Sequence, residues 1–416
     1  MTMTKVLFRD ARVFDGWSEE TRDGCDVLVA DGIVREISDT PLSVSGETEI
    51  VPCGGRILMP GLIDAHVHVY ASSINMPRVV RLPRTYLAHY ASQFMRASLD
   101  RGFTTLRDVG GADVGLASAL RDGLLQGPRL FYGGRVLSQT GGHGDMRPGD
   151  SELADDDACL CACHTDATGI VADGVDAVRR AVREELRRGA SHIKIMGSGG
   201  VASPTDPLER CQYSDEEIRV AVDETSRAGK YVASHCHPAE AIRRSVELGV
   251  RSIEHATLID DATAAFVAER GAYAVPTMAI AFALKEEGKA MGFPAASMAK
   301  LHMVADHALA GLDIMKRAGV KMAFGTDLLG TLHTRQSSEF ELRSRVLPSI
   351  DILRSACAIS AELLGEEGRL GCVREGAMAD LLVVDGDPLK DVTVLAGNGE
   401  NLAVIMNAGR FHKRTL

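Results

Sequence analysis

Short apolar runs alternate with longer segments of helical periodicity through the middle of the chain. This alternation is typical of a parallel sheet whose strands are joined by helical crossovers. The predicted strands span residues 62–66, 104–108, 129–132, 192–196, 231–235, 252–255, 273–276 and 321–326. The predicted helices include residues 175–188, 215–228, 239–248, 260–270 and 299–317, and Ser214 with Glu217 forms a capping box before the second of them. Eight such strands in about 300 residues predict one (β/α)8 barrel.

The two chain ends share a different pattern of short strands and tight turns. Residues 26–30 and 33–37 flank Asp31-Gly32, a strong hairpin signal, and residues 379–385 and 403–412 are similar in style. We therefore expect an α/β protein, a (β/α)8 TIM barrel over residues 59–368 with a small β-sandwich domain formed by residues 1–58 and 369–416.

The composition is that of a soluble globular protein, with 45% hydrophobic and 25% charged residues among 416. The net charge of −11 and the absence of a basic stripe argue against nucleic acid or an anionic membrane as a partner. The N-terminal residues show no apolar core of signal-peptide length, and no run of ~18 apolar residues predicts a membrane span. We expect a cytoplasmic protein that forms a homo-oligomer.

Nine cysteines, an odd number, favour reduced thiols over a disulfide framework. A dense tract combines Cys159, Cys161, Cys163 and His164. This tract is either a separate zinc site or a loop, and it lacks the paired two-residue spacing of structural zinc modules.

Polar residues that could bind metal end several of the predicted strands. His66 and His68 lie two residues apart, so on a strand they share a face. Active-site residues of (β/α)8 barrels lie at the C-terminal ends of the strands, and imidazole is the commonest metal ligand. The full candidate set is His66, His68, Lys194, His235, His255 and Asp327. Any one of these histidines could be an ordinary core residue, but the six positions together favour a metal centre.

The candidate ligands fall into two groups, one for each of two metal ions. His66, His68 and Asp327 would hold one, and His235 and His255 the other. A buried Lys194 can become a neutral amine and capture CO2 as a carbamate that bridges both, or it can pair with a carboxylate. Asp327 could take a proton from an attacking water. Nitrogen and oxygen ligands suit two zinc ions, with manganese, cobalt or iron as alternatives.

Several motifs resemble those of the amidohydrolase superfamily. They occur in the same order along the chain as in that family and extend over essentially its whole length. They lie at residues 59–68, 193–195, 234–235, 253–255, 325–327 and 376–384. The resemblance implies a barrel with a binuclear zinc site, a carbamylated Lys194 and Asp327 as general base.

A closer resemblance is to the imidazolonepropionase-related group that includes Xaa-Pro dipeptidase (prolidase)-like enzymes and ochratoxin-type amidases. It depends on residues 141–145, 195–207 and 212–214. It implies hydrolysis of the amide bond in a dipeptide or N-acyl amino acid with a free C-terminal carboxylate. His143 and Tyr231 would contact the scissile carbonyl or the oxyanion, although Tyr231 could instead pack within its strand. His237 is either a substrate contact or a solvated loop residue.

Other functions remain open from the sequence. A cyclic-amide hydrolase, a deaminase or an ochratoxin-type amidase would keep the fold and change the substrate. A non-catalytic assembly protein of the same fold would have lost its metal ligands, whereas this chain retains a full candidate set.

Overall fold

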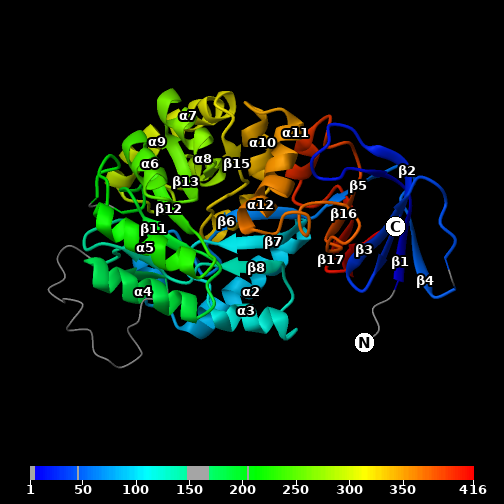
Figure 1. Cartoon of the computed structure of the whole chain (residues 1–416), viewed down its shortest axis with the longest axis horizontal. Coiled ribbons are helices and arrows are strands. Elements are labelled where there is room, and N and C mark those ends of the chain that lie inside the picture. The colour runs from blue at the N-terminus through cyan, green and yellow to red at the C-terminus, as the bar shows by residue number, and fades with distance from the viewer. Residues whose placement is uncertain (1–4, 45, 148–167, 204–205) are drawn as a thin grey trace.

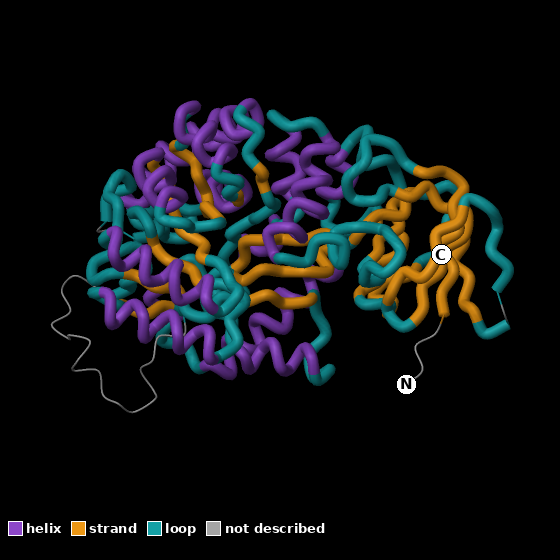
Figure 2. The backbone as a smooth tube through the Cα atoms, viewed as in Figure 1, coloured by secondary structure: helices purple, strands orange, loops and turns teal. Residues whose placement is uncertain are grey.

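The computed structural model describes residues 5–44, 46–147, 168–203 and 206–416 (Figure 1). The Cys159–His164 tract lies outside the described residues. Strands gather at one end of the molecule, and helices surround a second set of strands at the other, as Figure 2 shows. Among the described residues, no helix combines the length and apolarity needed to cross a membrane.

The sheet at one end is built from both ends of the chain. Its eight strands are β1 (Lys5–Val13), β2 (Arg22–Ala30), β3 (Ile33–Ser38), β4 (Thr48–Pro52), β5 (Ile57–Pro60), β16 (Leu381–Val384), β17 (Leu402–Asn407) and β18 (Arg410–Arg414). Their order is β18-β17-β16-β5-β1-β2-β3, with β4 also paired to β1. The central contact joins distant parts of the sequence, because β5 and β16 pair antiparallel with Leu58 opposite Val383. The hydrogen-bonded strands form one mixed sheet.

The middle of the chain forms parallel sheets. One contains β6 (Leu62–Val67), β7 (Phe103–Asp108) and β8 (Arg129–Tyr132). The other follows the order β10-β9-β11-β12-β13-β14-β15, made of β9 (Val136–Ser138), β10 (Gly169–Val171), β11 (Ile193–Met196), β12 (Val232–Pro238), β13 (Ser252–Leu258), β14 (Tyr273–Val275) and β15 (Lys321–Met322). Strands β9 and β10 were not predicted from the sequence, because three residues are too few to show a periodicity.

Backbone hydrogen bonds join the two parallel sheets at two places. The Ala65 amide donates to Phe324 O at 2.7 Å, which brings β6 beside the segment after β15. The Ser191 amide donates to Tyr132 O at 2.8 Å, which brings the start of β11 beside β8. These contacts place the C-terminal ends of strands that are far apart in the sequence at one edge.

Helices cover the parallel strands (Figure 1). The α-helices are α1 (Met76–Val79), α2 (Arg84–Asp100), α3 (Val114–Arg121), α4 (Val175–Arg187), α5 (Asp215–Arg227), α6 (Ala239–Glu247), α7 (Asp261–Glu269), α8 (Met278–Glu287), α9 (Ala295–Arg317), α10 (Ser338–Ser344), α11 (Ser349–Arg354) and α12 (Ser360–Leu364). Short 3-10 helices occupy η2 (Gly330–Arg335) and η4 (Val392–Ala396), and η3 (Ser355–Ile359) is a π-helix. The capping box predicted at Ser214 and Glu217 is present.

Candidate metal centre

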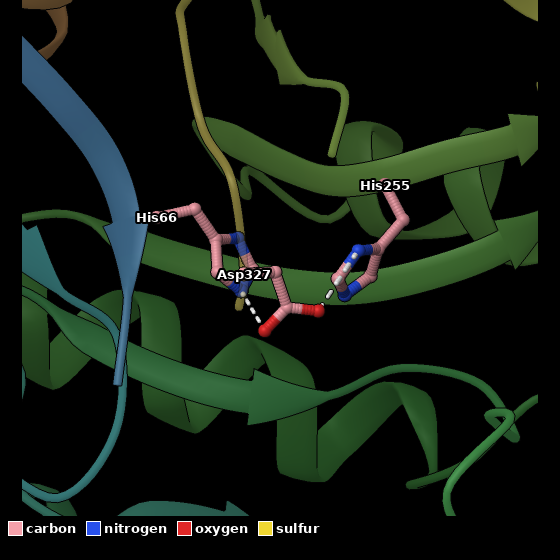
Figure 3. A group of neighbouring side chains, drawn as sticks. All are labelled: His66, His255 and Asp327. Atoms are coloured by element: carbon pink, nitrogen blue, oxygen red, sulfur yellow. Dashed lines mark ion pairs between the residues drawn. The ribbon is translucent and has the colours of Figure 1, made fainter. Parts of the chain in front are cut away.

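Three side chains from distant parts of the chain meet at the ends of the parallel strands. His66 comes from β6, His255 from β13, and Asp327 follows β15 (Figure 3). One candidate ligand atom from each lies within 4.8 Å of the others. Asp327 Oδ1 is 3.4 Å from His66 Nε2, and Asp327 Oδ2 is 3.9 Å from His255 Nδ1. The carboxylate therefore lies between the two imidazoles.

His68 completes this side of the cluster. Its Nε2 is 3.2 Å from Asp327 Oδ1, while its Nδ1 lies 2.9 Å from the carbonyl oxygen of Gly110. A side chain at Gly110 would have its Cβ 3.3 Å from the His68 ring, so the glycine permits this close approach of the backbone. The backbone carbonyl thus fixes one ring nitrogen and leaves the other facing Asp327.

A second group of histidines adjoins His255. The His235 ring, from β12, lies 4.4 Å from the His255 ring and 4.4 Å from the His143 ring, between centroids. Burial lowers the pKa values of His235 and His255 well below the ordinary value of histidine. Both rings are therefore neutral at pH 7, the form in which imidazole binds metal.

Lys194 on β11 is buried near the same cluster. Burial lowers the pKa of its amine, while the negative charges of Glu254 and Asp327 oppose that shift. A buried, less basic amine is the form that can react with CO2.

Two of the clustered residues have an unusual backbone conformation. His255 has φ of 73° and Asp327 has φ of 55°, a left-handed region that non-glycine residues seldom adopt. Such conformations cost on the order of 1–3 kcal/mol each and persist only where the surrounding structure enforces them. The strain is localised at the two residues that bring their side chains to His66.

The donor set fits a divalent cation. His66 Nε2 is buried and makes no hydrogen bond within the described part of the chain, although it faces Asp327. A buried imidazole nitrogen in this state costs free energy unless something binds it. Imidazole nitrogens and a carboxylate, without thiolates, match the preference of zinc and other first-row divalent ions.

A cavity opens beside the cluster, and its lining combines polar and apolar side chains. Its polar side contains His143, His235, His237, His255 and Asp327. Its apolar wall is formed by Val201, Ala202, Ile280, Ala281, Leu284, Phe293, Leu301, Val304 and Leu329. Helices α8 and α9 supply most of this wall, and a ligand here would have polar atoms toward the histidines.

His143 lies on a loop, lines the cavity, and is approached by the buried carboxylate of Asp206. Asp206 Oδ2 is 3.6 Å from His143 Nδ1 and accepts hydrogen bonds from the Gly200 amide at 3.2 Å and from Gln212 Nε2 at 3.0 Å. Lys300 of α9 donates to the carbonyl oxygens of Gly200, Ser203 and Asp206 at 3.0, 2.6 and 2.5 Å. Charged side chains thus fasten the segment that carries the cavity residues Val201 and Ala202.

His237 also lines the cavity, so the alternative of a solvated loop residue is wrong. It is buried, its Nδ1 lies 2.7 Å from Thr257 Oγ1, and its ring stacks on His255 at 5.1 Å between centroids. Burial lowers the pKa of His237 to about 3, so the ring is neutral.

The structure places Tyr231 away from the cavity, which corrects its expected contact with the scissile carbonyl. Tyr231 precedes β12, at the opposite end of the strand from His237, and it is not among the residues that line the cavity. Its ring stacks on His192 at 5.6 Å, and its hydroxyl accepts a hydrogen bond from Arg107 Nη1 at 3.4 Å. Strand packing, the alternative weighed from the sequence, is the role that these contacts support.

Several supporting residues were missed from the sequence. Glu254, Arg107, Thr257, Thr277 and Asp206 each contact a histidine of the site or a residue that does. Glu254 and Asp206 had usable signals, because Glu254 directly precedes His255 and Asp206 lies within the motif at residues 195–207. The others lie on separate segments and become neighbours only when the sheets form.

Comparison with known proteins identifies the family. Ochratoxinase of Aspergillus niger is 33% identical over 347 residues, which cover 81% of this chain and 72% of that enzyme. The crystal structure of an amidohydrolase is 49% identical with a TM-score of 0.96, covering 99% of this chain and 100% of that one. A prolidase complexed with N-methylphosphonate-L-proline is 42% identical with a TM-score of 0.95, with the same coverage. The model of the amidohydrolase family matches residues 57–410, and this chain therefore belongs to that family.

Proposed function

We propose that this protein is a metal-dependent hydrolase that cleaves the amide bond of dipeptides or N-acyl amino acids with a free C-terminal carboxylate. The observation that carries the proposal is the meeting of His66, His255 and Asp327 beside a cavity with an apolar wall. The similarity to a prolidase and to ochratoxinase supports an amide substrate.

The proposed centre has two zinc ions. His66, His68 and Asp327 would hold one, and His235 and His255 the other, with a carbamate on Lys194 between them. Bound zinc would polarise the substrate carbonyl and lower the pKa of water toward neutrality.

Asp327 is the proposed general base. Burial alone would raise the pKa of this carboxyl, but the neighbouring His66 and His68 hold it well below its usual range. The carboxylate is therefore ionised at pH 7. It takes a proton from the attacking water and passes it to the leaving nitrogen.

His143 and His237 are the proposed substrate contacts. Both line the cavity beside His235, and Thr257 engages His237 at Nδ1, which leaves Nε2 for the substrate. A hydrogen-bond donor at the developing oxyanion is commonly worth about two to three powers of ten in rate.

A second candidate is an ochratoxin-type amidase. The apolar wall between α8 and α9 suits a bulky acyl group, and ochratoxinase is among the relatives. A deaminase or a cyclic-amide hydrolase of the same family would release ammonia or open a ring instead.

We also propose that the two parallel sheets close into one (β/α)8 barrel over residues 59–368, and that residues 1–58 and 369–416 form a small β-sandwich domain. The described cysteines are all free thiols, which supports a reducing, cytoplasmic location. A homo-oligomer remains the expected assembly.

The test combines a substrate library with metal analysis of the same sample. Dipeptides and N-acyl amino acids are screened for hydrolysis, ammonia release is followed in parallel, and metal per chain is measured. We expect amide hydrolysis with two ions per chain. A library without a single hydrolysed member, or ammonia as the main product, would contradict the proposed reaction.

The Asp327→Asn variant tests the general base. We expect it to retain metal and to lose turnover by orders of magnitude, because an amide cannot take the proton. Asp313→Asn, at an exposed position paired with Arg317, is the control and keeps full activity. An active Asp327→Asn enzyme would remove Asp327 from this role.

A further inference from the structure

Glu254 forms a buried network behind the metal centre. Its Oε2 lies 2.7 Å from His66 Nδ1, and Arg107 Nη2 donates to both of its oxygens at 2.8 Å. Ser252 Oγ donates to Oε1 at 2.6 Å. Every one of these groups is fully buried. Both Glu254 oxygens are therefore engaged by protein donors.

Arg107 is itself held in place from several sides. Its Nε donates to Ala65 O at 2.5 Å, and its Nη1 donates to Ser252 Oγ at 3.2 Å and to the Tyr231 hydroxyl at 3.4 Å. Arg107 stays protonated and donates to both Glu254 oxygens, so Glu254 pairs with it as a carboxylate that accepts hydrogen bonds without donating any.

The strained backbone at His255 explains how this network reaches the centre. Neighbouring side chains on a regular strand point to opposite faces. Here Glu254 contacts His66 Nδ1, and the next residue, His255, has its ring 4.9 Å from the His66 ring. The φ of 73° at His255 turns the second side chain toward the same imidazole. The conformation thus accompanies an arrangement in which two consecutive side chains both approach His66.

We propose that Glu254 is a positioning residue for the metal centre. By accepting the hydrogen bond from His66 Nδ1, Glu254 directs His66 Nε2 toward the ion, and Arg107 keeps Glu254 in place. This proposal rests on the metal centre of the proposed function. It assigns no role to Glu254 in the reaction itself.

The first test uses the zinc-loaded wild-type protein. Two-bond nitrogen–proton correlations in protein with labelled histidine identify which ring nitrogen carries a proton, and loss of one signal set in His66→Gln assigns His66. We expect a proton on Nδ1 that exchanges slowly with water. If Nδ1 of His66 carries no proton in the wild-type protein, the proposal is overturned, and no Glu254 variant is needed for that conclusion.

The second test measures zinc affinity by competition with a chromophoric chelator. Removing a carboxylate partner of a metal-binding histidine typically weakens metal binding 10–100-fold, and we expect a loss in this range for Glu254→Gln. The matched control is Glu185→Gln. Glu185 is also buried and accepts hydrogen bonds from Arg135 at 2.7 and 2.9 Å, but none of its described hydrogen bonds involves a histidine.

The control separates positioning from general destabilisation. We expect Glu185→Gln to keep wild-type zinc affinity within twofold. Equal losses in both variants, or an unchanged affinity in Glu254→Gln, would overturn the proposal. Failure to cleave amides bears on the proposed function, whereas zinc affinity and the Nδ1 proton bear on Glu254.

Discussion

Replacement of Gly200 by alanine should disable His143 without touching the candidate metal ligands. The new Cβ would lie 2.5 Å from His143 Nδ1 and closer still to the ring atoms Cε1 and Nε2. Ordinary van der Waals contacts begin near 3.4 Å, so the ring must shift by about 1 Å. His143 stacks on His235 on its other side, at 4.4 Å between centroids, and this limits where the ring can go.

The magnitude follows from that displacement. A misplacement of about 1 Å in a catalytic constellation can cost roughly 100-fold in rate, and overpacking typically costs about 1–3 kcal/mol of stability. We therefore expect Gly200→Ala to lose about 100-fold in kcat/KM toward the best amide substrate. We expect it to remain folded and to retain its metal.

The assay is a double-mutant cycle with His143→Ala. If the methyl group acts through the His143 ring, Gly200→Ala should change kcat/KM little in the His143→Ala background. Gly46→Ala is the control, because a Cβ there meets no atom within 4 Å. Activity of Gly200→Ala within threefold of wild type, or an equal loss in both backgrounds, would refute the reasoning.

Three further substitutions test other parts of the structure. Tyr231→Phe should keep kcat/KM within threefold, because the hydroxyl contacts Arg107 and lies outside the cavity; a loss of 100-fold or more would restore Tyr231 to the reaction. Arg343→Met should lower the free energy of unfolding in urea by about 3–5 kcal/mol, since it leaves Glu339 buried without its partner, and a loss below 1 kcal/mol would contradict this. Lys300→Met removes the hydrogen bonds from Lys300 to the carbonyl oxygens of Gly200, Ser203 and Asp206, each worth about 1.5–3 kcal/mol. We therefore expect KM to rise and limited proteolysis near Val201 and Ala202 to accelerate. An unchanged KM and an unchanged cleavage rate would show that other contacts hold these residues in place.

The periodic pattern predicted most of the parallel strands and the helices between them. It succeeded where apolar residues form a continuous run, as in β6 and β11, because such runs are buried whatever the neighbouring strands are. It missed β9 and β10, which are three residues each and depend on pairing for their conformation.

The candidate metal site was predictable because the residue types and their places in the strands are local properties. His66 and His68 share a face through a two-residue spacing, and Asp327 follows an apolar strand. The error at Tyr231 has a local cause as well. A residue that begins a parallel strand lies at the opposite end of the sheet from a residue that ends it.

The sequence by itself determined the alternation of strands and helices, the polar residues at the strand ends and the family motifs, since each depends on residues that are close in the chain. Only the tertiary structure decided that Glu254 and Arg107 support His66, that Asp206 and Lys300 hold the loop at His143, and that α8 and α9 form an apolar wall. The side-chain contacts of Glu254, Arg107, Asp206 and Lys300 join residues separated by about 60 to 190 positions. No local pattern encodes such pairs, because each exists only after the whole chain has packed around the parallel strands.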